Sequence, residues 1–548
     1  MLRTFCLLLL AFMATSVALA QSTPQWGRHQ ISLTSQTDYS NPLYEVEHFG
    51  AELTAPSGRN LRVNGFWDGA NDWRIRILPD EVGTWEYTTF CSDTTNANLH
   101  RVSGRFECTA PDREEAIFQR GDITRSPGAY HLMHRDGTPF FFTACTAWNG
   151  GLKSTEQEWD TYLQHRKDHH YNTIQLVLTP WRGADQNSQG EVAYEGSGRI
   201  RINPSFFQHM DQKMDRINEY GLVAAPVVLW ALQKGDGREL SPGYALPDEV
   251  AVRLARYLVA RYGAHHVIWL LGGDGNYVEN YEQRWKYIGQ QVFDDYHPGL
   301  VTLHPRGRLW IGEAYADQPW LDIVTYQSSH SNQAGTVEWI TKGPMTHLWD
   351  QLPPRPLVNM EPNYEEIPVY RAEGKIEAVD VRNASYWSLF ATPLAGITYG
   401  ANGIWPWIRE GERIINHGSL NDNPPSPWSE SINFPGSRQI GHLSEFIQQF
   451  EWWTLKPAPD RLMTQPGDDD YRQFVSLVQT DDASLVLAYV PRPTTVTLYN
   501  PQRLTYQGQW FDPATAKYEA ADVFSEKGVL RVTSPGEEDR VLVLRRKE

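Results

Sequence analysis

Cysteine is scarce in this chain, with four residues in 548. One of them, Cys6, lies in the N-terminal leader described below, so at most one disulfide remains open to the rest of the chain. Cys91 and Cys108 flank a predicted hairpin loop, and they could pair in an oxidising compartment or stay reduced. Cys145 lies in the apolar segment at residues 140–145, which favours a buried free thiol.

Positive charge is also in short supply. The chain has 49 Lys and Arg residues against 66 Asp and Glu residues, a formal net charge of -17. Such a surface repels a phosphate backbone, which argues against nucleic acid as a partner. The HExxH metal spacing, the G-x-S-x-G nucleophile motif and the Walker motif are missing too. The sequence therefore predicts no metal and no cofactor.

Long apolar runs are confined to the N-terminus. Arg3 supplies a positive charge, residues 6–12 an apolar segment, and residues 17–20 a small-residue cleavage site. This is the pattern of a secretory signal peptide, and it is too short for a membrane anchor. No later segment approaches the roughly 20 apolar residues that a membrane span needs. We therefore expect residues 1–20 to be removed and the protein to be secreted or periplasmic, without a membrane span.

Three regions with different patterns of apolar and polar residues follow the leader. Residues 21–110 contain short alternating runs, such as residues 73–77, separated by Gly, Pro and Asn, which predicts an N-terminal β-sandwich. Residues 111–455 alternate apolar strands with amphipathic helices, the signature of βα units. In residues 456–548 short strands return, which predicts a C-terminal β-sandwich.

Eight strands are predicted in the central region, at residues 139–147, 173–179, 222–229, 267–271, 300–304, 322–327, 356–360 and 395–404. Helices are predicted between them, for example at residues 154–169, 204–220 and 248–262, with Ser154 and Gln157 at the spacing of a capping box. Eight such units fit one barrel. The predicted fold class is α/β, a (β/α)8 TIM barrel flanked by two β-sandwiches.

Two carboxylates end strands of this barrel. Asp274 follows the fourth strand, with Gly272 and Gly273 leaving space and allowing a strained turn, and Glu361 follows the seventh. Strand ends face the active site of a barrel, where a pair of carboxylates can cleave a glycosidic bond. Alternatively, Asp274 caps a helix and Glu361 is a surface charge. Glu365 and Glu313 compete, but both lie in loops.

Aromatic residues recur at the same strand ends, in a chain with 21 tryptophans. Each one alone is more typical of packing, but their recurrence on one barrel face favours sugar binding, because the C–H faces of sugars stack on aromatic rings. His330 follows the sixth strand and could hydrogen-bond the substrate or the nucleophile. The predicted substrate-binding residues are Trp148, Trp181, Arg182, Trp230, Asn276, His330, Tyr399 and Trp405.

The segments that carry these residues resemble the apiosidase-like glycoside hydrolases. The matching motifs are VIWLLGGD at residues 267–274, VNMEPNYE at 358–365 and TYGANGIW at 398–405. Residues 65–69 resemble the sandwich domain fused ahead of that family's barrel, and residues 509–513 resemble a collagen-binding-type module. The resemblance covers nearly the whole mature chain. It implies that Asp274 is the general acid/base and Glu361 the nucleophile.

Two positions depart from the pattern of that family. Cys145 stands where the family usually has Asp in an Asp-Thr-Ala-Trp motif, and Ile397 stands where it usually has His before Thr-Tyr-Gly. Both changes fall near the sugar subsite. The resemblance therefore implies glycoside hydrolysis without implying apiose as the sugar released.

The sequence thus predicts a secreted glycoside hydrolase that needs no cofactor. Its expected substrate is a plant or algal polysaccharide, or an oligosaccharide derived from one, and its expected mechanism is retaining. The alternative is a non-catalytic glycan-binding protein on the same barrel scaffold. The presence of both carboxylates favours the enzyme, because a binding protein has no use for the pair.

Overall fold

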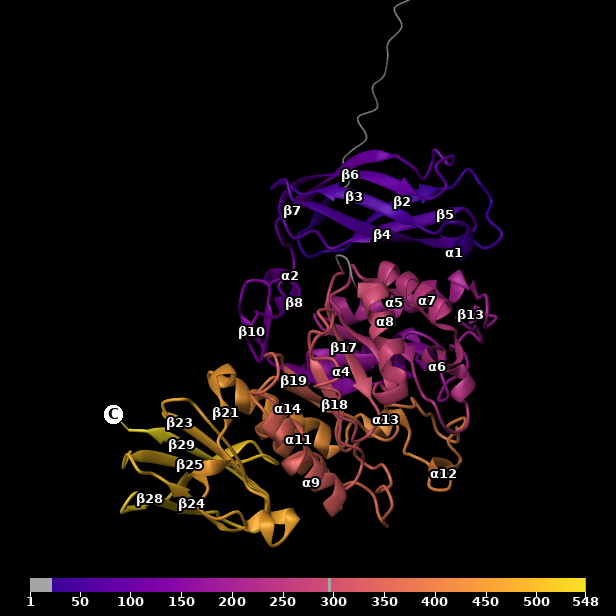
Figure 1. The fold of residues 1–548 in the computed structure, drawn as a ribbon. Coiled ribbons are helices and arrows are strands. Elements are labelled where there is room, and N and C mark those ends of the chain that lie inside the picture. The colour runs from indigo at the N-terminus through magenta and orange to yellow at the C-terminus, as the bar shows by residue number, and fades with distance from the viewer. Residues whose placement is uncertain (1–21, 294–296, 548) are drawn as a thin grey trace, which may run out of the picture.

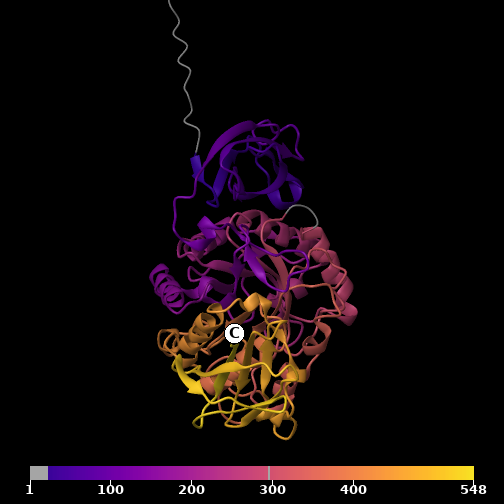
Figure 2. The ribbon, with the colours of Figure 1, turned by 90° about the vertical axis from the view of Figure 1, so that its left-hand side faces the viewer.

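The computed structural model describes residues 22–293 and 297–547, and the protein is mixed α/β with a barrel-like sheet (Figure 1). An N-terminal β region lies above a central region of strands and helices, as the side view in Figure 2 also shows, and a second β region forms the C-terminal end. The predicted signal peptide at residues 1–20 lies outside the described residues. Within those residues, no helix combines the length and apolarity that crossing a membrane requires.

The N-terminal region is one seven-stranded sheet in the order β1-β7-β6-β3-β4-β5-β2. β4 pairs with β3 through its first half and with β5 through its second, so the two halves of the sheet share a core around Trp73 and Trp85. The alternation predicted at residues 73–77 is β5. The elements are β1 (Ser22–Pro24), β2 (His29–Thr34), α1 (Pro42–Glu45), β3 (Phe49–Thr54), β4 (Asn60–Gly69), β5 (Asp72–Ile77), β6 (Gly83–Cys91) and β7 (Ser103–Thr109).

The register of β6 and β7 decides the state of two cysteines. Cys108 pairs with Gly83 at the beginning of β6, whereas Cys91 is the last residue of that strand. A rise of about 3.3 Å per residue puts these ends about 26 Å apart, whereas a disulfide requires Cα atoms within about 7 Å. Both thiols are buried and free, so the possible Cys91–Cys108 disulfide is excluded. Cys145 is also buried and free, as predicted.

Eight strands surround the centre of the molecule, in two sheets whose paired strands run parallel. Six form a sheet in the order β17-β16-β15-β12-β11-β20, and β18 pairs with β19. The backbone amides of Asp322 and Ile323 donate to Val301 at the edge between β17 and β18, and β19 contacts β20, so the strands succeed one another around a ring. They are β11 (Phe142–Thr146), β12 (Thr173–Val177), β15 (Val223–Trp230), β16 (Ile268–Gly275), β17 (Leu300–Pro305), β18 (Val324–Gln327), β19 (Leu357–Glu361) and β20 (Gly396–Tyr399).

Each of these strands overlaps a predicted one, because almost every residue in them is buried and the sequence shows it as a short apolar run. A small antiparallel sheet leads into the ring, and a hairpin lies between β12 and α5. The short elements are α2 (Ala116–Gln119), β8 (Ile123–Thr124), β9 (Leu132–His134), β10 (Pro139–Phe140), β13 (Tyr194–Glu195) and β14 (Arg201–Ile202).

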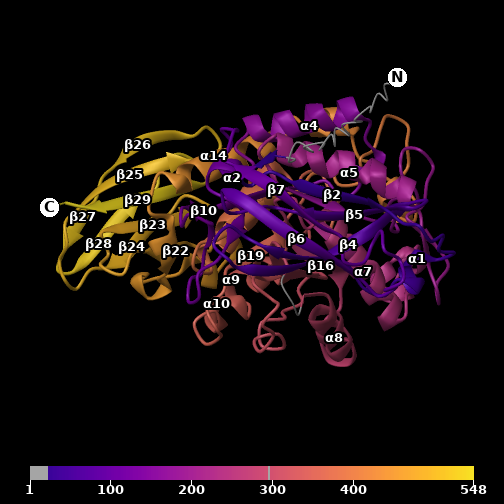
Figure 3. The same cartoon turned by 90° about the horizontal axis from the view of Figure 1, so that it is seen from above.

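Helices cover the outside of the ring, with α4 and α5 on one side of the molecule and α8 on the other (Figure 3). The helices predicted at residues 204–220 and 248–262 are present as α5 and α7. The helical elements are α3 (Gly150–Lys153), α4 (Glu156–Asp168), α5 (Pro204–Glu219), η1 (Arg238–Leu240), α6 (Pro242–Ala245), α7 (Asp248–Tyr262), η2 (Glu279–Tyr281), α8 (Glu282–Phe293), α9 (Ala334–Lys342), α10 (Met345–Leu348), α11 (Ala378–Phe390), α12 (Gly418–Asn421), α13 (Trp428–Ser431) and α14 (Pro435–Gln448).

The capping box of α4 lies one residue later than the predicted one. Thr155 accepts a hydrogen bond from the amide of Glu158, whose side chain accepts from the amide of Thr155. Ser154 is unavailable because its hydroxyl and its carbonyl both accept from the buried ammonium of Lys213, at 3.0 and 2.9 Å. A tertiary contact thus selects between two adjacent residues with equal capping ability.

The C-terminal region consists of two further antiparallel sheets, in the orders β21-β22-β23-β29-β25-β26 and β24-β28-β27. The strands predicted at residues 485–490 and 495–499 are present as β23 and β24. The elements are η3 (Trp452–Thr454), β21 (Lys456–Pro457), η4 (Pro459–Arg461), η5 (Pro466–Asp468), η6 (Tyr471–Gln473), β22 (Ser476–Gln479), β23 (Leu485–Val490), β24 (Thr495–Tyr499), β25 (Tyr506–Asp512), β26 (Lys517–Ala521), β27 (Phe524–Glu526), β28 (Val529–Thr533) and β29 (Arg540–Arg546).

Buried charges attach both β regions to the central region. Asp211 of α5 binds Arg76 of β5 and Arg261 of α7, each at 2.7 Å, and their charges lower the pKa of Asp211 against the opposing effect of burial. On the other side, Arg382 of α11 binds Asp539 at 2.9 and 2.5 Å, and both side chains are at most 5% exposed.

Candidate active site

Asp274 lies near the end of β16 on a distorted stretch of backbone. The pairing of β16 with β17 shifts register between Leu270 and Gly273, and again before Gly275. Asp274 itself has a φ of 51°. Such a left-handed conformation is uncommon outside glycine, and residues that adopt it cluster at functional sites. The bulge and this conformation together determine where the carboxylate of Asp274 is directed.

The two glycines before Asp274 serve close packing rather than the predicted strained turn, because neither has a positive φ. A Cβ atom at Gly273 would lie 2.5 Å from the ring of Trp230, and one at Gly272 would lie 2.6 Å from the hydroxyl of Tyr277. Only a residue without a side chain fits at these positions. The glycines therefore allow β16 to lie directly against the aromatic residues beside it.

Glu361 ends β19, and three side chains converge on its carboxylate. Gln327 of β18 donates to Oε1, and His330 Nε2 lies 3.1 Å from the same oxygen. His304, at the end of β17, has Nε2 3.3 Å from Oε2. The His304 ring also reaches β16, where the amide of Asp274 donates to Nδ1 at 3.4 Å. One imidazole thus connects the two carboxylate-bearing strands.

The two carboxyl groups have opposite electrostatic environments. Burial, and then the negative charge of Glu361, raise the pKa of Asp274 to about 6. Burial would also raise the pKa of Glu361, but the hydrogen bonds and charges of His304 and His330 outweigh it and hold this pKa well below its usual range. Near pH 6 one carboxyl group therefore holds a proton for part of the time while its neighbour is ionised. A general acid and a nucleophile need this combination.

All four tryptophans predicted to bind substrate form one cluster beside this pair. The ring of Trp148 lies 5.5 Å from that of Trp230 and 5.3 Å from His304, and Trp181 bridges Trp230 at 4.1 Å and Trp405 at 6.0 Å. All four are nearly buried, at 2–3% exposure. Among the described residues, the buried indole N–H groups of Trp230 and Trp405 have no hydrogen-bond partner.

Arg182 lies at the same edge as these tryptophans. Its guanidinium contacts the ring of His417, with Nε 2.8 Å from Nε2. Burial lowers the pKa of Arg182, and the charges of Asp274 and Asp236 partly oppose this effect. Asn276, two residues beyond Asp274, uses its backbone amide to bind Gln233 at 3.2 Å and its side-chain oxygen to accept from Val278.

Tyr399 and Glu365 bind each other instead of the carboxylate pair. The Tyr399 hydroxyl donates to Glu365 at 2.6 Å, and the other oxygen of Glu365 accepts from the amide of Gly436 at the beginning of α14. Glu365 therefore connects the loop after β19 to α14. Glu313 is exposed and accepts from the indole of Trp310. Of the competing carboxylates, neither takes part in the network around Glu361.

Three residues of the site were missed by sequence reasoning: His304, Gln327 and His417. His304 ends the predicted fifth strand, and Gln327 ends the sixth. Their positions at strand ends were therefore a sufficient signal to predict both as active-site residues. His417 lies in a long loop, and no local pattern indicates that it meets Arg182. Within residues 22–293 and 297–547, no group of three or more His, Cys, Asp or Glu side chains has the arrangement of a metal site.

Sequence models of three families match successive parts of the chain. The family described as "Apiosidase-like, catalytic domain" matches residues 126–454, more than half of the chain. "Domain of unknown function (DUF5060)" matches residues 22–92, and "Putative collagen-binding domain of a collagenase" matches residues 458–545. No functionally curated protein matches the chain by sequence.

Solved structures with the same fold include several described as glycoside hydrolases. One described as "Glycoside hydrolase" has 22% identity and a TM-score of 0.68, covering 79% of this chain and 98% of its own. A glycoside hydrolase family 5 protein from Bacteroides vulgatus has 22% identity and a TM-score of 0.67, covering 78% and 94%. A "putative glycoside hydrolase" from the same species has 18% identity and a TM-score of 0.71, covering 96% and 100%. At such identities the similarity demonstrates a common fold.

Proposed function

The chain belongs to the apiosidase-like catalytic domain family and is a glycoside hydrolase, and on that premise we propose that Asp274 and Glu361 perform retaining hydrolysis. The proposed substrate is a plant or algal polysaccharide, or an oligosaccharide derived from one. The observation that carries the assignment of roles is the opposite direction of the two pKa shifts. The group with the raised pKa is the acid, and the group kept ionised is the nucleophile.

In the first step, Glu361 attacks the anomeric carbon of the sugar. The bond from that carbon to the leaving oxygen breaks, and Asp274 transfers its proton to this oxygen. A covalent glycosyl ester on Glu361 results, and Asp274 is left ionised. The ionised Asp274 then removes a proton from water, whose oxygen attacks the same carbon and displaces Glu361. Two inversions restore the original anomeric configuration, and both carboxyl groups return to their starting states.

The residues around the pair support both steps. Gln327, His304 and His330 hold the carboxylate of Glu361 in one orientation, which lowers the entropic cost of attack. The unpartnered indole N–H groups of Trp230 and Trp405 supply donors for sugar hydroxyls. Arg182 adds positive charge near Asp274. The proposed sugar-binding site consists of Trp148, Trp181, Arg182, Trp230, Asn276, His330 and Trp405. Tyr399 has a supporting role instead, because its hydroxyl binds Glu365.

The proposal extends to the architecture and the compartment. The order of the parallel strands supports a (β/α)8 barrel in residues 111–455, and the shared core of the first sheet and the two sheets of the last region support flanking sandwiches in residues 21–110 and 456–548. The leader at residues 1–20 supports secretion or a periplasmic location. An extracellular polysaccharide would then meet the enzyme outside the cytoplasm.

A glutamine substitution at Glu361 tests the nucleophile. Glu361→Gln keeps the size of the side chain but cannot form the glycosyl ester, so we expect hydrolysis to be abolished while the fold is retained. Substrates are found by incubating the wild-type protein with a panel of plant and algal polysaccharides and measuring released sugar. Glu365→Gln is the matched control, because this glutamate is also buried but lies outside the network. Full activity in Glu361→Gln, or an inverted first product in NMR of the wild-type reaction, would contradict the assignment.

A further inference from the structure

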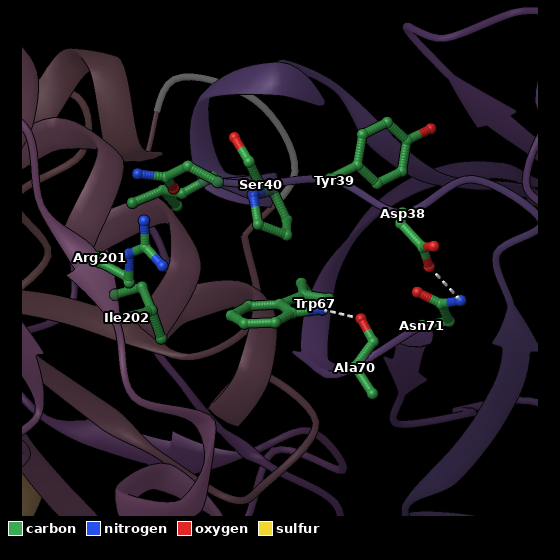
Figure 4. A pocket seen from close by; sticks show the side chains of 11 residues that line it. Asp38, Tyr39, Ser40, Trp67, Ala70, Asn71, Arg201 and Ile202 are labelled. Atoms are coloured by element: carbon green, nitrogen blue, oxygen red, sulfur yellow. Dashed lines mark hydrogen bonds between the residues drawn. The ribbon is translucent and has the colours of Figure 1, made fainter.

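A cavity lies where the N-terminal sheet meets the central region, and its lining includes neither carboxylate of the pair. It has a volume of about 470 Å³, within the range of small-molecule sites. Figure 4 shows the indole of Trp67 across its floor, with Tyr39, Asp38 and Asn71 on one side and Arg201 and Ile202 on the other. The first four come from the N-terminal region and the last two from β14. We call this cavity the seam pocket.

The two aromatic rings of the seam pocket, Trp67 and Tyr39, are held in place by contacts outside the cavity. The indole N–H of Trp67 donates to the carbonyl of Ala70 at 2.8 Å, within the tight β4–β5 turn, where Ala70 has a φ of 43°. The hydroxyl of Tyr39 donates to Asp93 at 2.7 Å, and its ring packs edge-on against Trp73. Since the polar atoms of both rings are already used, the rings offer the pocket an apolar surface that is held rigid without a ligand.

Polar groups of complementary kinds surround these rings. Asn71 donates to Asp38 at 2.8 Å, which aligns a planar amide and a planar carboxylate beside each other (Figure 4). Asp38 is exposed and has acceptor capacity left, as does the amide oxygen of Asn71. In the described part of the chain, no residue forms a hydrogen bond or ion pair with the guanidinium of Arg201. The pocket thus combines free donors and free acceptors around an apolar floor.

We propose that the seam pocket binds a sugar ring of a glycan chain, with the apolar face of the ring on Trp67. Hydroxyl groups at the ring's edge both donate and accept, so Asp38, Asn71 and Arg201 can all bind them. The inference rests on the proposed function in taking a glycan as the ligand. It adds a glycan-binding site that is separate from the carboxylates.

One connection of the chain, between β12 and α5, contributes residues both to this pocket and to the proposed active site. Trp181 and Arg182 follow β12, and the same connection continues through β13 and β14 to Arg201 and Ile202 before α5 begins. A polysaccharide held in the seam pocket is therefore anchored to the segment that also contributes to the active site. Anchoring raises the local concentration of polymer chains at that site but does nothing for an oligosaccharide too short to reach both.

Binding to polymers tests the proposal separately from catalysis. The full-length protein carrying Glu361→Gln is run through native gels that contain citrus pectin, arabinoxylan or alginate. We expect at least one polymer to retard it, and we expect Asp38→Ala with Asn71→Ala to weaken that binding about tenfold. Trp67→Ala should do the same. Because Trp67 also packs against the core, the double variant at exposed Asp38 and half-buried Asn71 is the one expected to keep the fold.

Trp453→Ala is the matched control, since Trp453 is a partly exposed tryptophan at the other end of the central region. It should leave retardation unchanged. In a background with Glu361 intact, the Asp38/Asn71 variant should hydrolyse short oligosaccharides normally and the retarding polymer more slowly. Retardation that survives in both pocket variants, or no retardation by any of the three polymers, would overturn the seam pocket. If the wild-type protein hydrolysed none of the glycans, that result would instead count against the proposed function.

Discussion

Asp274 and Glu361 carry the same functional group, and their surroundings make them different. Burial of Asp274 and the neighbouring negative charge of Glu361 outweigh the positive charges of Arg182 and the two histidines, so the pKa of Asp274 rises to about 6. Glu361 lies between two imidazoles and an amide, so its pKa falls. The difference depends mainly on His304 and His330, because both contact Glu361 and only the backbone of Asp274 binds a histidine.

The raised pKa of Asp274 predicts a pH profile. The proposed acid must be protonated to assist the leaving group, so kcat/KM on a natural glycan should decline as pH rises through about 6. Glu361 stays ionised throughout this window, so its own titration does not contribute to the decline. The measurement is kcat/KM against pH with the wild-type protein.

Removing the carboxyl group provides the control for that profile. Asp274→Ala should cost a factor of about 10²–10⁴ on a natural substrate and much less on an aryl glycoside whose leaving group needs no proton. Its alkaline decline should also disappear. An equal loss on both substrates, with the decline still present, would show that Asp274 has a structural role.

At the scale of single elements, β16 illustrates how packing positions a functional group. Its glycines let the strand lie against Trp230 and Tyr277, and the pairing of β16 with β17 shifts register at the same residues. The strand therefore reaches its conformation through contacts with β15 and β17 rather than through its own preferences. Side chains at either glycine would compete with the tryptophan cluster for the same space.

Gly273→Ala should therefore damage activity and stability together. The new Cβ would lie 2.5 Å from Trp230 and 2.8 Å from Val227, so the strand must shift. Overpacking of this kind typically costs about 1–3 kcal/mol, and a shift of about 1 Å can cost about 10²-fold in rate. Thermal unfolding and kcat measure the two effects. Gly418→Ala, where a Cβ meets nothing within 4 Å, should change neither.

The elements themselves could be predicted because their signals are local. An apolar run bounded by turns indicates a buried strand, and each of the eight central strands was found in this way, which also put Asp274 and Glu361 at strand ends. Relations between elements could not be predicted. Lys213 decides whether Ser154 or Thr155 caps α4, and the register of β6 and β7 separates Cys91 from Cys108. The bridge that His304 makes between β16 and β19 requires three strands in place.

At the scale of the whole molecule, the outer regions are attached by contacts typical of protein interiors. Asp211 is shared by two arginines from different regions, and Arg382 meets Asp539 in a nearly dry environment. The ring of Tyr489 stacks on Tyr386 of α11 at 4.5 Å, beside that second ion pair. Such interfaces resist relative motion of the regions more than wet, polar ones do.

Breaking the second ion pair should loosen the C-terminal region. Asp539→Ala leaves the buried guanidinium of Arg382 without its counter-charge, and such losses typically cost about 3–5 kcal/mol. We expect a lower Tm in calorimetry and faster proteolysis near residue 456. Replacing both partners by apolar residues, Arg382→Met with Asp539→Leu, should recover most of the loss. A wild-type Tm in Asp539→Ala would show that the pair contributes nothing to the attachment.

The connection between β12 and α5 contributes residues to both proposed sites, and this has an evolutionary consequence. Insertions or deletions within it would move Arg201 relative to Arg182 while leaving Asp274 and Glu361 on their strands. Loops tolerate such changes far better than strands do. The preference for long over short glycans can therefore diverge between descendants of this protein while the bond-breaking chemistry is inherited unaltered.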